Sequence, residues 1–75
     1  MTYRTLIGNT NEDGIVSIAS QRVTLDRQLA EELAEHWNNR MLGREHDAIG
    51  TLSYIAVQCL EHEGARWETL TEYEI

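Results

Sequence analysis

The stretch that decides the predicted fold is 66–75, RWETLTEYEI, near the C-terminal end of the chain. Residues two apart in a β-strand point to the same side, and two kinds of side chain alternate along this stretch. One side is aromatic and β-branched, and the other is mostly acidic, with Glu68, Leu70, Glu72 and Glu74. We therefore predict a strand over 66–75 that carries a row of carboxylates on one face.

Two more strands are predicted at the N-terminal end, over 2–8 and over 15–19, with a continuation of the second to Val23 left open. Between them, 8–14 reads GNTNEDG, which is a concentrated turn signal ending in Asp-Gly. A turn of this kind between two β-rich stretches predicts a β-hairpin.

The middle of the chain predicts two helices. The first begins at Thr24, whose hydroxyl can cap it, and stops at Gly43. Its apolar stripe repeats at spacings of three and four and consists of Leu29, Ala30, Leu33, Ala34, Trp37 and Met41. The second helix runs from Glu45 to His62, and its core face consists of Ile49, Leu52, Ile55, Ala56, Cys59 and Leu60.

These elements give an α+β fold in the order ββααβ, as a single compact domain over 1–75. We expect a three-stranded antiparallel sheet with two helices packed on one face. The last strand either pairs with the first or lies at an edge. We favour pairing with the first strand, because a connection through two helices can return the chain there. Trp37, Trp67 and Tyr73 are expected to pack in the core.

Charge restricts the classes of partner. Thirteen acidic residues face six arginines and no lysine, for a net charge of -7. Binding to DNA or RNA requires clustered positive charge, and anionic lipid headgroups repel an acidic chain, so direct nucleic-acid and membrane binding are excluded. A basic protein surface is the expected partner, and nucleic-acid-binding grooves are the commonest surfaces of that kind. Solubility alone is the alternative reason for the acidity.

Seven acidic residues are the candidate partner-binding residues. Three lie on the last strand and four lie in the first helix: Glu68, Glu72, Glu74, Glu31, Glu32, Glu35 and Asp26. A regular row of carboxylates on a rigid strand can imitate a line of phosphates and occupy a basic groove. A solvated face that binds nothing is the alternative.

No cofactor, metal site or catalytic group is predicted. The loop 8–14 begins like a calcium-binding loop, but Ser20 stands where that loop needs a bidentate Glu. Cys59 and His62 are three apart on the predicted second helix. Structural zinc needs four ligands, and His36 and His46 would have to supply the rest; a nucleophilic pair needs an orienting third group. We therefore expect a non-enzymatic protein.

The expected location is the cytoplasm. A single cysteine excludes an internal disulfide and suggests a reducing compartment. The N-terminus lacks the apolar core of a signal peptide, and no apolar run reaches the ~20 residues that span a bilayer.

In size, acidity and mix of strand and helix, the chain resembles the small inhibitor proteins that bacteriophages make against host defences, the anti-CRISPR proteins in particular. The resemblance covers the whole chain loosely and is carried by size and composition. It implies a non-enzymatic inhibitor that blocks a DNA- or guide-binding surface of a host nuclease complex. The alternative is a small structural or assembly module that forms a homodimer through its apolar surfaces, with no role related to nucleic acid.

Overall fold

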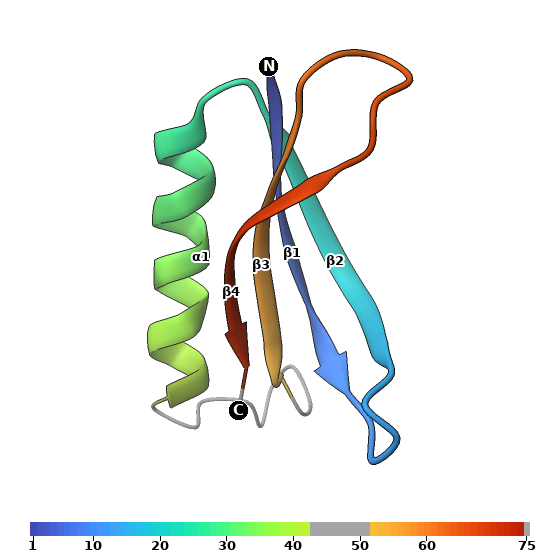
Figure 1. Cartoon of the computed structure of the whole chain (residues 1–75). Helices are drawn as coiled ribbons and strands as arrows, with labels where there is room; N and C mark the ends of the chain where they lie inside the picture. Colours follow the sequence, from blue (N-terminus) through green and yellow to red (C-terminus); the bar gives the residue numbers. More distant parts are fainter. Residues whose placement is uncertain (43–51, 75) are drawn as a thin grey trace.

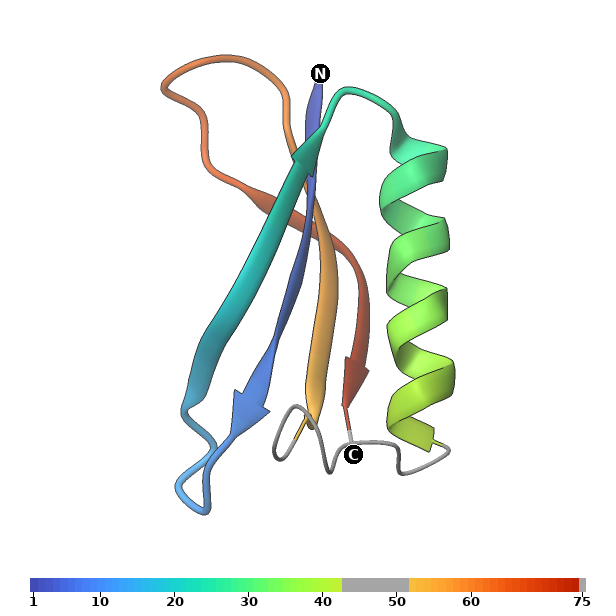
Figure 2. The same ribbon diagram turned by 180° about the vertical axis from the view of Figure 1, so that it is seen from behind.

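The computed structural model describes residues 1–42 and 52–74, and within them the chain forms four antiparallel strands and one helix. In chain order they are β1 (Thr2–Thr10), β2 (Val16–Thr24), α1 (Arg27–Leu42), β3 (Tyr54–Leu60) and β4 (Glu68–Glu74). The order across the sheet is β2-β1-β3-β4, so β2 and β4 are its edges. Figure 1, and the view from behind in Figure 2, show α1 on one side of this sheet. We call the opposite side the open face.

The prediction of a three-stranded sheet with two helices in the order ββααβ is wrong. The stretch assigned to the second helix contains β3, while its first part, 45–51, lies outside the described residues. β3 is a central strand, and its first four residues are all buried. In a strand that is buried on both faces, apolar residues follow one another instead of alternating with polar ones. A short apolar run satisfies the spacing of a helix as well as that of a buried strand, and only the β-branched Ile55 and Val57 favoured the strand.

β3 also decides where the last strand lies. The favoured pairing of the last strand with the first is wrong, because β3 pairs with β1 on one side and with β4 on the other. The last strand is therefore an edge, as in the alternative arrangement. The prediction that this stretch is a strand is confirmed, with bounds of Glu68–Glu74.

The predicted N-terminal hairpin is confirmed, since β1 and β2 pair antiparallel. Asn11 organises its turn: the Oδ1 atom accepts hydrogen bonds from the backbone N–H groups of Asp13 and Ile15, both at 2.9 Å. Gly14 adopts a φ of 80°, a conformation that glycine tolerates without steric cost. The oxygen of Asn11 therefore serves the turn, which agrees with a hairpin loop rather than a calcium-binding loop.

A β-bulge interrupts the hairpin ladder opposite Gly8. Ile7 pairs with Ser20 and Gly8 pairs with Ile18, so β2 carries one extra residue, Ala19. The strands approach closely at this point. A Cβ atom added to Gly8 would lie 2.1 Å from the backbone oxygen of Ser17, so only glycine fits there.

α1 begins at Arg27 rather than at Thr24, because Asp26 is the capping residue. The Oδ1 atom of Asp26 accepts a hydrogen bond from the backbone N–H of Gln28 at 2.9 Å, which is the bond an N-cap makes. The Thr24 hydroxyl accepts from the backbone N–H of Asp26 at 3.2 Å. Thr24 therefore shapes the turn that precedes the helix.

The main core lies between α1 and the two central strands. Ala30 and Ala34 are each 1% exposed, and their small side chains let the helix approach the sheet closely. The fully buried Thr5 donates its hydroxyl hydrogen to the backbone oxygen of Ala30 at 2.8 Å. The cluster is completed by Leu52, Ile55 and Val57, with Tyr3, Ile7, Trp37 and Tyr73 packed around it. The expected core positions of Trp37 and Tyr73 are thus confirmed.

A second, smaller cluster lies on the open face and consists of Leu6, Tyr54 and Ala56. Trp67 belongs to this side and not to the core under α1. The guanidinium carbon of Arg4 lies 4.1 Å from the centre of the Trp67 ring. The connection between β3 and β4, which precedes Glu68, curves away from α1 in both views (Figures 1 and 2).

Gly8→Ala is expected to lower the free energy of unfolding by about 1–3 kcal/mol, because the new methyl group must displace the backbone of β2. Urea unfolding followed by circular dichroism measures this change. Ser17→Ala keeps the backbone oxygen in question and should alter stability by no more than about 0.5 kcal/mol. A Gly8→Ala variant as stable as the native chain would contradict the need for glycine at the bulge.

Candidate protein-binding surface

The glutamates of α1 are all exposed. Glu31 accepts a hydrogen bond and forms an ion pair with the guanidinium of Arg27, with Nε and Oε1 3.0 Å apart. This contact raises the pKa of Arg27. Glu32 accepts from the amide of Gln28 at 3.1 Å, while Glu35 is exposed one turn further on. Two of these three carboxylates therefore support the helix through contacts one turn apart.

Glu72 and Glu74 point from the open face. Tyr73 stands between them and packs against the core under α1, and neighbouring strand residues point to opposite sides. The Oε1 atom of Glu72 accepts a hydrogen bond from the hydroxyl of Tyr54 at 2.6 Å. The Oε1 atom of Glu74 accepts one from the hydroxyl of Thr10 at 3.1 Å. Both carboxylates thus connect β4 to other strands.

Glu68 does not share the face of the other two β4 glutamates. The ladder between β3 and β4 has a bulge at which Leu70 has no paired residue. The amide of Gln58 donates to the hydroxyl of Thr69 at 3.1 Å on the open face. Glu68 precedes Thr69 and therefore points to the side of α1. The bulge divides the carboxylates predicted to form one row between the two faces of the sheet.

The seven candidate acids therefore form two groups on opposite sides of the sheet. The helix acids lie on the exposed side of α1, which covers one face, and Asp26 is used as the helix cap. Glu72 and Glu74 lie on the open face. The fold leaves all seven exposed, but it does not gather them into one continuous acidic surface.

The groups considered for metal or nucleophilic chemistry are separated by the fold. Cys59 is a buried free thiol in β3, and His62 is exposed in the connection that follows, so their placement on one helix is wrong. The Nδ1 atom of His62 lies 2.9 Å from the backbone oxygen of Glu63. Within 1–42 and 52–74, no three or more His, Cys, Asp or Glu residues are grouped so that they could hold a metal ion. His46 lies outside the described residues.

A row of polar side chains crosses the open face from β2 to β4, and sequence reasoning did not identify it. Arg4 is its centre: its Nε donates to Gln58 at 2.8 Å and its Nη1 donates to Gln21 at 3.4 Å. Gln58 continues the row to Thr69. Burial lowers the pKa of Arg4, whose guanidinium stacks on Trp67. The row ties both edge strands to the central pair.

The most extensive exposed apolar region surrounds β2. Every residue of β2 except Thr24 is exposed. Of the eight large apolar side chains that stay exposed in the described residues, six fall within 15–29, on the open face of β2, at its two ends and on α1 beside it. They are Ile15, Val16, Ile18, Val23, Leu25 and Leu29, and we call them the β2 surface.

The position of α1 explains why the helix side of β2 is left uncovered. α1 packs mainly on β1 and β3 and less on β2. Pairing with β1 turns Ser20, Arg22 and Thr24 toward the helix side, and these polar residues offer α1 no apolar surface. On the open face the same strand presents the apolar Val16, Ile18 and Val23.

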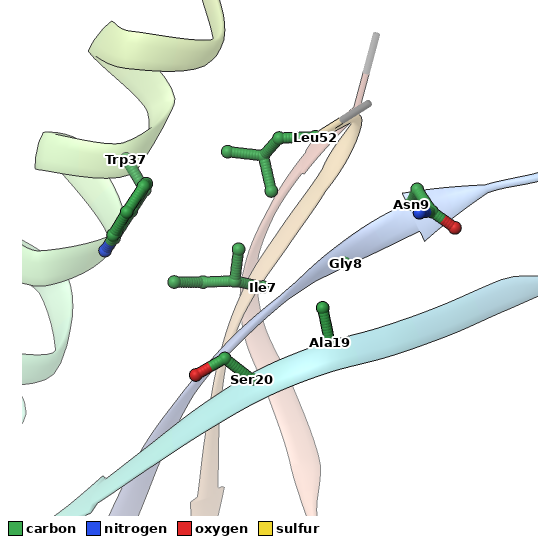
Figure 3. A pocket seen from close by; sticks show the side chains of 7 residues that line it. All are labelled: Ile7, Gly8, Asn9, Ala19, Ser20, Trp37 and Leu52. Carbon is green, nitrogen blue, oxygen red and sulfur yellow. The ribbon is translucent and has the colours of Figure 1, made fainter. Parts of the chain in front are cut away.

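Two hollows lie between α1 and β2. The first has a volume of about 330 Å³, and Figure 3 shows Trp37 of α1 facing Ile7 of β1, with Ala19 and Ser20 of β2 beside them. The second, of about 260 Å³, is bordered by β2 residues and by Leu29, Ala30 and Leu33 of the helix. Together the hollows leave a groove along the helix side of β2.

The two edges of the sheet differ in charge. β4 carries three glutamates in seven residues and a bulge, and both are devices that discourage another strand from pairing with an edge. Residues 14–25, which include all of β2, contain no acid, and Arg22 is their one charged residue. Among the described residues, the β2 edge is protected only by this arginine and by its own bulge. It is therefore the edge of this sheet that is open to a partner strand.

Comparison of the chain with protein-family models gives no match, and comparisons with curated proteins and with solved structures give none either. No helix within the described ranges is both long enough and apolar enough to cross a membrane.

The Tyr54–Glu72 contact predicts an alkaline transition. Burial, followed by the hydrogen bond to Glu72, raises the pKa of Tyr54 from 10.0 to about 12. The fold favours the neutral phenol, so this contribution to stability is complete below pH 10 and is lost as the pH rises from 10 to 12. The difference between absorbance titrations at 295 nm of the native chain and Tyr54→Phe should show one step near pH 12. Glu72→Gln should move that step to lower pH. A step at pH 10 in the native chain would show that the contact is absent.

Proposed function

We propose that the chain is a non-enzymatic binding protein that recognises another protein through the β2 surface. The contrast between the two sheet edges supports this most strongly. β4 is acidic and bulged, whereas β2 lies among exposed apolar side chains without any acid. An exposed edge strand offers unpaired backbone N–H and C=O groups to a partner strand, a recurring mode of protein recognition.

The β2 surface is large for a protein of this size. The exposed parts of its six residues amount to roughly 600 Å² in total, divided between the open face of β2 and the helix side, where Leu29 lies. Apolar surface of this extent is costly to leave in water, and covering it is the main favourable term in protein association. The buried free thiol of Cys59 fits a reducing compartment, so a cytoplasmic location is part of the proposal.

A second candidate function is electrostatic inhibition of a nucleic-acid-binding complex through a basic protein surface, in the manner of an anti-CRISPR protein. Two observations favour it: all seven candidate acids are exposed, and they lie apart from the β2 surface. Their division between two sides of the sheet weakens it, because mimicry of a phosphate line needs the carboxylates in one row. Any such contact would use either the α1 acids or Glu72 and Glu74.

Affinity capture with the immobilised chain separates the two functions. Partners of the β2 surface should remain bound at 500 mM salt and should be lost with Val23→Glu, which puts a charge at an exposed apolar position near the end of β2. The matched control is Leu70→Glu, which places the same charge at an exposed position of β4.

The electrostatic function predicts the reverse pattern. Bound proteins would then be lost at 500 mM salt and with Glu72→Gln or Glu35→Gln, and would be retained by Val23→Glu. That pattern would contradict recognition through the β2 surface.

A further inference from the structure

We infer that the partner of the β2 surface is a second copy of this chain, and that the two β2 strands pair antiparallel to join two four-stranded sheets into one of eight strands. This inference rests on the proposed function, since it names the partner of the same surface. It follows from the geometry of the edge, the charge around it and the apolar area that it exposes.

The geometry of the edge suits a copy of itself. β2 is nine residues long, and its far side faces no other strand of the described chain. When two identical strands pair antiparallel about a two-fold axis, each supplies the donors and acceptors that the other lacks, so the contact is self-complementary. The bulge at Ala19 limits regular pairing to the segments on either side of it.

Charge selects a second copy over a basic partner. A basic protein would be drawn to the acids on α1 and β4, whereas the stretch 14–25 carries no acid. Two chains of net charge -7 repel each other through most of their surface, and the β2 surface is where this repulsion is weakest.

The exposed area is sufficient for a stable dimer. The side chains of the β2 surface expose roughly 600 Å² in each copy, against the ~800 Å² that each partner buries in a standard stable interface. The backbone and small side chains of a nine-residue strand supply the remainder. A domain of 75 residues buries a modest fraction of its surface alone, so a second copy also contributes to its stability.

The dimer has a defined shape. A two-fold axis perpendicular to the joined sheet places both helices on the same face. The grooves between α1 and β2 of the two copies then meet along the axis, bordered by Leu29, Leu33 and Trp37 of each chain. The acids of β4, at the far edge of each sheet, remain away from the contact.

Sedimentation equilibrium of the native chain tests this inference, with Val23→Glu and Ile18→Glu as variants and Leu70→Glu as the matched control. The native chain and the control should have twice the monomer mass of 8.6 kDa at micromolar concentration. Both β2 variants should weaken the dimer by at least ~30-fold, because each puts a charged side chain into the contact. Raising the salt from 50 to 500 mM should leave the dimer unchanged or strengthen it. Circular dichroism checks that each variant is folded.

A native chain that stays monomeric up to ~1 mM would overturn the inference, without any need for the variants. A dimer that persists in both folded β2 variants would overturn it too, because the contact would then lie elsewhere. The proposed function is tested separately. If the chain is monomeric but captures another protein, and Val23→Glu abolishes that capture, the proposed function stands and the dimer is excluded. If the chain is monomeric and Val23→Glu does not change the proteins it captures, both the dimer and recognition through the β2 surface are excluded.

Discussion

The hydrogen bond from the Thr5 hydroxyl to the backbone oxygen of Ala30 fixes α1 over the centre of the sheet. It is fully buried, and it lies beside Ala30 and Ala34, whose small side chains bring the helix axis close to β1 and β3. A buried hydroxyl must keep its partner, because leaving it unpaired costs about 1–3 kcal/mol. The helix therefore cannot slide toward β2 without losing both this bond and its apolar contacts. The exposure of β2 on its helix side follows from this position.

The two edges of the sheet differ in how readily another strand can pair with them. The carboxylates of Glu72 and Glu74 bond to Tyr54 and Thr10, so the acids of β4 hold that edge to the sheet while they discourage another strand. On the β2 side, Arg4 and Gln21 provide the corresponding tie across the open face. They leave the outer rim of β2 apolar and without acid. An acidic protein thus keeps one surface that another acidic molecule can approach.

Local signals in the sequence were enough for the hairpin, α1 and β4, because the Asn11–Gly14 turn, the helical apolar stripe and the alternation in the last strand are each contained in a short stretch. β3 was misread because a strand buried on both faces has no alternation. Exposure of the candidate acids followed from their charge, but their division between two faces depends on the bulge at Leu70. The β2 surface could not be read from the sequence, since Val16, Ile18 and Val23 lie on the open face of an edge strand, and neither the face nor the edge position is encoded in a short stretch.

The measurement that tests the account most directly is amide hydrogen exchange along β2 at two protein concentrations, for example ~5 µM and ~500 µM. If a second copy pairs with β2, amides within Val16–Thr24 become more protected at the higher concentration, while those of β4 exchange at the same rate at both. Exchange of β2 that is fast and independent of concentration would contradict the claim that this strand is the binding edge of the protein.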